Sequence, residues 1–225
     1  PDVGLAGSIA LNYVIQELQF TEIGHLESDA LPPVIVVHEG DPKPPFRLYS
    51  KGDIVAVISE IPIESWLIPS VARAVVDWVK SKDVELLIAL SGIAVQNRLE
   101  IDVPAVYGVG SSASSKKVMK DVNIEIFEEG FIVGFHAVLM RECLKKNLPG
   151  MVLLAQSHLQ YPDPGAAASL ITSFNNLVGL KVDTKRLLEQ EDEIRLKTRE
   201  LMQRTQQQMR QTQKGREQEI PPMYA

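Results

Sequence analysis

The stretch PSVARAVVDWVKSKDVELLIAL, residues 69–90, decides the fold class of this chain. Its first part predicts an amphipathic helix over residues 69–80, because four valines recur at helical spacing and share one face. These valines are Val71, Val75, Val76 and Val79. Its last part, residues 86–90, is a short apolar run of the kind that forms a buried strand. A helix followed closely by a buried strand is typical of α/β domains.

The same two patterns recur on both sides of this stretch. Apolar, β-branched runs predict further strands at residues 34–37, 54–58, 101–109, 124–127 and 152–155. Helical spacing predicts further helices at residues 3–18, 131–145 and 165–177. Because strands and helices alternate, we expect a mainly parallel sheet covered on both faces, in a three-layer α/β/α core domain over residues 1–183.

The composition changes near Asp183, and the remaining residues are predicted to form an appendage. Leu187, Ile194 and Leu201 recur every seventh residue, which predicts a C-terminal helix over residues 184–214. Threonines and many glutamines interrupt this apolar seam, so a solvated spacer and a helix packed against another chain both remain open. Gly215 should end the helix, and two later prolines predict an extended tail over residues 215–225.

Length, composition and charge narrow the class of protein. The 225 residues, 45% of them hydrophobic, suit one α/β domain with an appendage. A net charge of −6 argues against a nucleic-acid or anionic membrane partner, and no apolar run reaches the roughly 18 residues of a membrane span. The single cysteine, Cys143, excludes an internal disulfide. We therefore expect a cytoplasmic protein.

Few residues suggest catalysis. The glycine- and serine-rich segment from Gly108 to Lys116 could hold a phosphate on backbone N–H groups, but it lacks P-loop spacing and fits a helix N-cap equally. Ser91 follows a predicted strand, at the edge where α/β sheets bind ligands, and Glu60 could act as a buried base. The four histidines lack the spacing of metal ligands. We expect no metal, no cofactor and no enzymatic activity.

The last three residues, Met223, Tyr224 and Ala225, have the chemistry of a docking segment. Tyrosine supplies a rigid ring with one hydroxyl group, and methionine an adaptable apolar neighbour. A terminal carboxylate can bind a lysine or a group of backbone N–H donors. The tripeptide resembles the C-terminal hydrophobic-Tyr-any motif by which proteasome activators and assembly chaperones dock between α-subunits of the proteasome.

Short segments also recur along the body of the chain in a specific order. They are GLAGSIA (4–10), LPP (31–33), EG (39–40), RLY (47–49), SEIPI (59–63), VYG (106–108), EGFIVG (129–134), PDP (162–164), AAA (166–168) and GLKVD (179–183). In this order they resemble the recurring blocks of the proteasome assembly chaperone family over about residues 4–187. The family is related in fold to phosphorylase and nucleosidase-like α/β enzymes, so the resemblance also leaves open a nucleoside or nucleotide site near Ser91 or Gly110.

The resemblance implies a non-enzymatic protein that binds the proteasome α-ring through its C-terminal tail. Burial of one tyrosine provides only weak binding after the entropy loss of docking, so useful affinity needs several linked tails. We therefore expect a homo-oligomer whose partners are proteasome α-subunits. The alternatives are a phosphorylase-like enzyme and a structural oligomer in which the tail folds back onto a neighbour.

Overall fold

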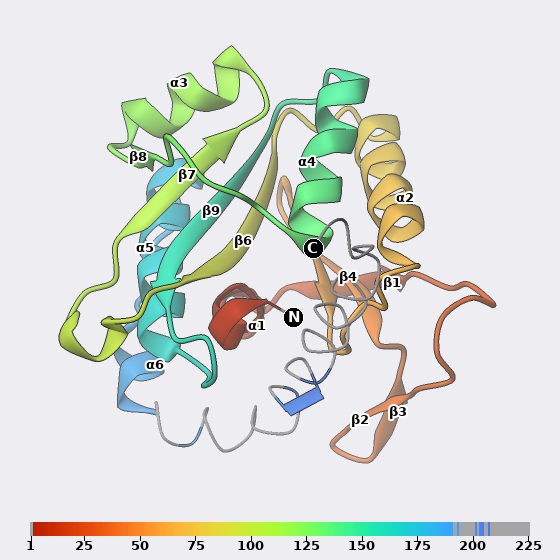
Figure 1. The fold of residues 1–225 in the computed structure, drawn as a ribbon. Helices are drawn as coiled ribbons and strands as arrows, with labels where there is room; N and C mark the ends of the chain where they lie inside the picture. The colour runs from red at the N-terminus through yellow and green to blue at the C-terminus, as the bar shows by residue number, and fades with distance from the viewer. Residues whose placement is uncertain (1, 191–192, 194–200, 202, 205–206, 208–225) are drawn as a thin grey trace, which may run out of the picture.

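The computed structural model describes residues 2–190, together with residues 193, 201, 203–204 and 207 (Figure 1). Its helices are α1 (Ala6–Glu17), α2 (Ile68–Ser81), α3 (Ala113–Asp121), α4 (Gly134–Lys146), α5 (Pro164–Val178) and α6 (Lys185–Glu189), with short 3-10 helices at Val3–Leu5 and Arg98–Glu100. Its strands are β1 (Thr21–His25), β2 (Val36–His38), β3 (Asp41–Lys43), β4 (Phe46–Lys51), β5 (Ile54–Ser59), β6 (Leu87–Ala94), β7 (Val106–Gly110), β8 (Glu125–Ile126) and β9 (Gly150–Ser157). The helices predicted at residues 69–80, 131–145 and 165–177 are confirmed as α2, α4 and α5.

A four-stranded sheet with the order β6-β9-β7-β8 forms the centre of the molecule. β6 pairs with β9 and β7 pairs with β8 in parallel, but β7 runs antiparallel to β9. The expectation of a mainly parallel sheet is therefore wrong, because the sheet is mixed. The physical reason lies between β6 and β7, where a loop with a single 3-10 turn takes the place of a crossover helix. The chain re-enters the sheet at the end it has just left.

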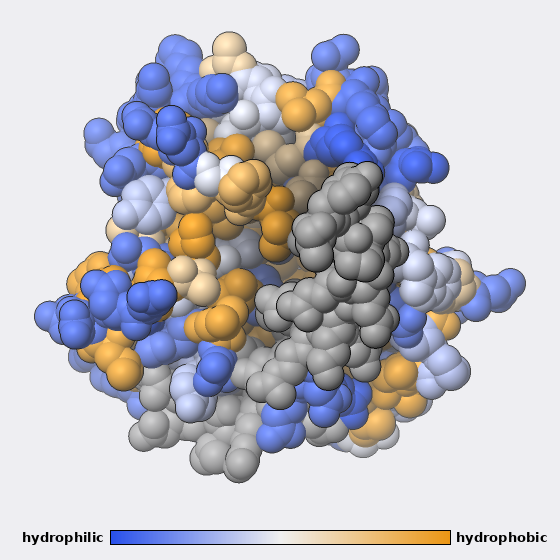
Figure 2. Space-filling model, in the orientation of Figure 1, coloured by the Kyte–Doolittle hydropathy of each residue, from blue (hydrophilic) through white to orange (hydrophobic). Residues whose placement is uncertain are grey.

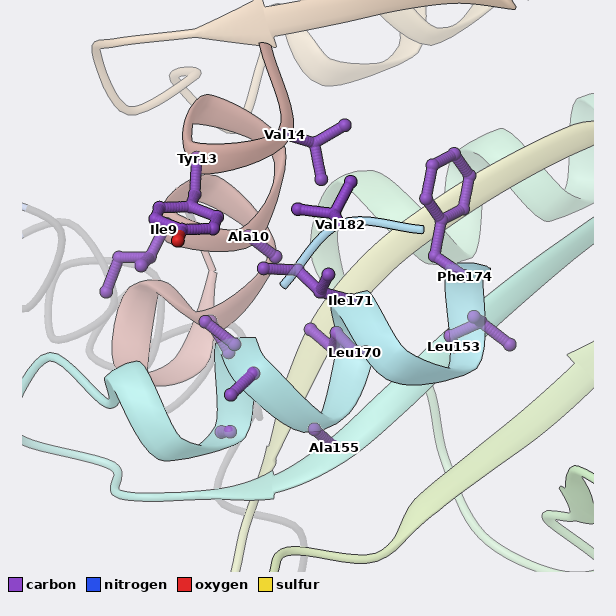
Figure 3. Packing of buried hydrophobic residues seen from close by; sticks show 14 of the residues in the cluster. Ile9, Ala10, Tyr13, Val14, Leu153, Ala155, Leu170, Ile171, Phe174 and Val182 are labelled. Atoms are coloured by element: carbon purple, nitrogen blue, oxygen red, sulfur yellow. The ribbon is translucent and has the colours of Figure 1, made fainter. Parts of the chain in front are cut away.

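Helices cover both faces of this sheet (Figure 1). On one face, α1 and α5 pack against Met151, Leu153 and Ala155 of β9 in a first hydrophobic cluster (Figure 3). On the other face, α2 and α4 pack against Val152 and Leu154 in a second cluster. Each fully buried aliphatic side chain of this kind contributes about 1.5–3 kcal/mol to stability. Because successive side chains of β9 point to opposite faces of the sheet, this one strand contributes to both clusters.

A second, antiparallel sheet with the order β1-β4-β5 lies beside α1. The sequence patterns predicted β5 but missed β1 and β4, because their alternating polar residues do not form apolar runs. The strand predicted at residues 34–37 is not a buried strand. Residues 36–38 instead form β2, half of an exposed hairpin with β3.

The segment after residue 183 stays in contact with the body in its described part. α6 spans Lys185–Glu189, and its Leu187 is fully buried in the first cluster. Leu201 is helical and packs against the same cluster. α6 ends at Glu189, and most of the helix predicted over residues 184–214 lies outside the described residues, so that prediction stays a prediction. Among the described residues, no helix is long and apolar enough to cross a membrane.

Candidate functional site

The predicted docking residues Met223, Tyr224 and Ala225 lie outside the described residues, as does the whole predicted tail, residues 215–225. The described body can therefore be examined for the other candidate groups and for the surface that it offers to a partner.

Ser91 belongs to a closely packed part of β6. Its side chain is buried, and its Oγ lies 3.4 Å from the carbonyl oxygen of Gly92. The N–H of Gly92 donates to Asp2 at 2.9 Å, and a Cβ built on Gly92 would lie 2.2 Å from the carbonyl oxygen of Val3. The start of the chain thus covers the strand end that sequence analysis considered for a ligand.

The segment from Gly108 to Lys116 is a strand end followed by a capped helix. Ser112 accepts the N–H of Ser115 at 3.1 Å, and the Oγ of Ser115 accepts the N–H of Ser112 at 3.0 Å, which is a capping box at the start of α3. A Cβ on Gly110 would lie 2.7 Å from the Oγ of Ser115. The glycine and serines therefore have a complete structural explanation.

Glu60 has partners that sequence analysis did not identify. It forms an ion pair with Arg47, whose side chain is buried, and it lies 2.9 Å from the Nε2 of His38. Arg47 also lies 3.6 Å from Glu22 and sits over the ring of Tyr49 at 5.4 Å. These contacts connect β1, β4 and the β2–β3 hairpin to the end of β5. The geometry supports a structural carboxylate.

Among the ion pairs of the described residues, the most deeply buried one joins Arg98 to Asp163, and sequence analysis missed it. The carboxylate of Asp163 accepts two hydrogen bonds from Arg98, one from Nε at 2.8 Å and one from a terminal guanidinium nitrogen at 2.9 Å. It also accepts the backbone N–H groups of His158 at 3.0 Å and Ala166 at 2.9 Å. Burial alone would raise the pKa of Asp163, but these hydrogen bonds outweigh it and hold the pKa below its usual value. Asp163 before Pro164 is an N-cap signal, but it gives no indication of Arg98.

A second buried carboxylate, that of Asp2, anchors the start of the chain to β6. It accepts the N–H groups of Gly7 at 3.0 Å and Gly92 at 2.9 Å.

Two titratable side chains of α4 have shifted pKa values. Burial lowers the pKa of His136 despite the opposing charge of Asp2. Burial, assisted by Glu142, raises the pKa of Cys143 to about 11, so this thiol is protonated near neutral pH. Within the described ranges, no group of three or more His, Cys, Asp or Glu side chains could hold a metal ion.

Large apolar side chains are exposed on the loops that follow β6, β8 and β9. They are Leu99, Val103, Phe131, Val133, Leu159 and Tyr161. Figure 2 shows hydrophobic residues around a hollow in the middle of the face on which α4 begins. A contiguous exposed apolar patch, unlike single exposed side chains, is typical of a surface that contacts another protein.

Comparison with known proteins gives a consistent relationship over most of the chain. A sequence model of the PAC2 family matches residues 1–202. An uncharacterised protein of Methanocaldococcus jannaschii is 28% identical over 203 residues, covering 89% of this chain and 82% of that protein. The crystal structure of Pyrococcus furiosus PbaA, described as an archaeal homologue of proteasome-assembly chaperone, is 31% identical with a TM-score of 0.87. The alignment covers 92% of this chain and 91% of PbaA.

A further structure, Pyrococcus furiosus PbaB, is described as an archaeal proteasome activator. It is 22% identical with a TM-score of 0.71, and the alignment covers 89% of this chain and 91% of PbaB. At this identity the likeness extends to the fold alone.

Proposed function

The chain belongs to the PAC2 family, and on this premise we propose that it is a non-enzymatic proteasome-binding protein, acting as an assembly chaperone or activator. Its C-terminal tripeptide, Met223, Tyr224 and Ala225, docks between α-subunits of the proteasome α-ring. The observation that carries the proposal is the 31% identity to PbaA over 92% of this chain, at a TM-score of 0.87. The hydrophobic-Tyr-any sequence at the end of the chain supports the same partner.

Docking assigns a separate role to each of the three residues. Tyr224 packs at the mouth of an inter-subunit pocket, Met223 contacts its apolar wall, and the carboxylate of Ala225 pairs with a lysine. Burying about 150–250 Å² of tyrosine stabilises the complex by roughly 4–6 kcal/mol before the loss of chain and rigid-body entropy. About 4 kcal/mol corresponds to a Kd of roughly 1 mM.

A single tail is therefore too weak, and the function requires several tails on one particle. Linking tails through a homo-oligomeric body raises the overall affinity by about 10²–10⁴-fold. In this scheme residues 1–183 form the oligomerising α/β core, residues 184–214 a helical spacer, and residues 215–225 the docking tail. The protein would work in the cytoplasm, beside its proteasome partner.

The enzymatic alternative has less support from the described residues. Ser91 is buried beneath the start of the chain, Gly110 contacts the α3 cap, and Glu60 pairs with Arg47. Each group thus has a structural role. A relation to phosphorylase-like enzymes stays a prediction about the fold.

The proposal is tested by comparing the intact chain with a variant lacking residues 223–225 and with Tyr224→Ala, in a pull-down on proteasome α-rings. Both changes should abolish retention, because each removes the tyrosine ring, and the deletion also removes Met223 and Ala225 with its carboxylate. Tyr161→Ala is a matched control, since Tyr161 is an exposed tyrosine on the body. Native mass spectrometry with and without α-rings would give the oligomeric state and the stoichiometry. Retention of the Tyr224→Ala protein at the level of the intact chain would refute tail docking.

A further inference from the structure

The central sheet ends at β8, and the outer side of this strand is open. β8 is the last strand in the order β6-β9-β7-β8, so no other strand of the described residues pairs with its outer side. Figure 1 shows β8 at the margin of the sheet, beside α3. The opposite edge strand, β6, is occupied at Gly92, whose N–H donates to Asp2 at 2.9 Å. β8 is therefore an edge to which a further strand can be added.

The register of β8 against β7 directs the backbone groups of Ile126 outward. Tyr107 pairs with Glu125 and Gly108 with Ile126 in parallel. The N–H of Phe127 donates to the carbonyl oxygen of Gly108 at 3.0 Å. Because backbone groups of successive strand residues point to opposite sides, Glu125 and Phe127 face β7 and Ile126 faces away from it. The N–H and the C=O of Ile126 thus point toward the open edge.

An open groove lies along this edge. It has a volume of about 390 Å³, and its lining residues are Lys120, Asn123, Ile124, Glu125, Ile126 and Glu128. Ile126 is half-buried, whereas Glu125 and Glu128 are exposed. The groove therefore offers outward backbone groups, an apolar side chain, and two carboxylates against the single ammonium group of Lys120.

The segment after β8 extends this surface. Glu128, Glu129 and Gly130 are exposed, and Phe131 is 94% exposed. Figure 1 shows the segment passing from β8 to the start of α4. A large exposed aromatic ring beside several carboxylates fits a partner that is both apolar and positively charged. We refer to residues 125–131 as the β8-edge surface.

The charges of this surface determine which kind of strand fits it. A second copy of β8 would bring Glu125 and Glu128 close to the same carboxylates, and like charges on neighbouring strands are unfavourable. A segment that carries lysine or arginine is attracted instead. Since strand side chains alternate between two faces, an added strand lies beside Glu125 on one face and beside Ile126 on the other. The segment that fits best therefore alternates basic with apolar residues.

We propose that the β8-edge surface binds an extended segment of a partner protein in which basic and apolar residues alternate. The segment adds a fifth strand to the central sheet, and its backbone forms hydrogen bonds with the N–H and the C=O of Ile126. Its basic side chains pair with Glu125 and Glu128, and an apolar side chain packs on Phe131. In strand addition the main chain provides affinity and the alternating side chains provide specificity. This contact is independent of docking by the C-terminal tripeptide, because it uses other residues.

The test measures binding of a short peptide of alternating lysine and valine to the full chain by isothermal titration calorimetry. Both peptide ends are capped, so the peptide carries no carboxylate. Two further peptides are N-methylated on the backbone, one at the valines and the other at the lysines. One of these two should bind about tenfold more weakly, because the peptide edge that faces β8 then lacks its N–H donors.

Variants of the chain locate the contact. Glu125→Lys should weaken binding of the alternating peptide about fivefold, because an attractive cross-strand pair becomes repulsive. Glu85→Lys is the matched control, since Glu85 is also exposed but lies before β6, the opposite edge strand, and does not line the groove. Its affinity for the peptide should equal that of the unchanged chain. Thermal unfolding of both variants checks that the fold is kept.

The remaining outcomes would each overturn the proposal. The first is equal affinity for the alternating peptide and for a peptide with the same residues in two separate blocks, because attraction between charges alone then explains binding. The second is equal weakening in Glu125→Lys and Glu85→Lys, and the third is equal binding of both methylated peptides and the unmethylated one. Self-association of the chain that the alternating peptide disrupts would identify a second copy as the occupant. Absence of binding would reject the surface altogether.

Discussion

Replacing Asp163 by asparagine tests the buried ion pair that joins two loops of the body. The substitution keeps the size of the side chain but removes its charge, and Arg98, only 8% exposed, loses the carboxylate that accepts two of its N–H groups. Removing one partner of a buried pair costs about 3–5 kcal/mol. Since a domain has about 5–15 kcal/mol of stability in total, this loss is a large fraction. For a domain of this length it lowers Tm by roughly 6–20 °C.

The assay is urea and thermal unfolding, with Asp121→Asn as the control. Asp121 pairs with Lys117 at 2.6 Å on the surface, so the same chemical change there should cost less than about 1 kcal/mol. Adding Arg98→Met to Asp163→Asn should restore part of the stability, because no buried cation is then left without a carboxylate. A loss below about 1 kcal/mol for Asp163→Asn alone would refute this account.

The same pair predicts a pH dependence. The pKa of Asp163 is lower in the folded state than in the unfolded chain, so its stabilisation is present above the unfolded value of about 3.9. This contribution is lost as pH falls through the folded pKa. The stability difference between the intact chain and Asp163→Asn should therefore narrow below about pH 4, as measured by urea unfolding at several pH values.

Three further perturbations test other parts of the fold. Cys143, with a pKa of about 11, should have about 0.1% thiolate at pH 8 and react slowly with iodoacetamide until urea unfolds the protein; rapid native labelling would contradict its burial. Gly4→Ala should destabilise by more than about 1 kcal/mol, since Gly4 has a φ of +61° and a Cβ there would lie 2.0 Å from the Oγ of Ser157. Gly52→Ala, with positive φ but open space, should cost less. Ser112→Ala should cost about 1 kcal/mol through loss of the α3 cap, and an unchanged Tm would argue against the capping box.

The sequence predicted the elements whose hydrophobic period is strong. Helices α2 and α5 and strands β6 and β9 appear where their apolar patterns place them, because burial on one or both faces controls the residue choice at each position. The direction of β7 could not be predicted, because direction depends on the path of the preceding loop and leaves no periodic signal. β4 was missed for a related reason. In β4 the buried but polar Arg47 lies between the apolar residues Phe46 and Leu48, and its polarity hides the strand pattern.

The candidate site was predictable only where it depends on local chemistry. The serine cap of α3 was considered from its spacing, and the structure favours it over a phosphate site. The partners of Glu60 and Asp163 were not predictable, since Arg47 and Arg98 come from other elements and a single sequence does not record contacts between them. The exposure of Phe131 was likewise hidden, because an apolar residue before a helix usually packs inward.

The position of β9 has a consequence for biosynthesis. β9 lies between β6 and β7, yet it is the last of the sheet strands along the chain. About 60 residues are made between the end of β6 and the end of β9, which takes the ribosome roughly 3–12 s. During this interval β6 and β7 lack the neighbour that they share, and their unpaired edges are open to contacts with other nascent chains. Folding of the central sheet is therefore expected to be a late event in translation.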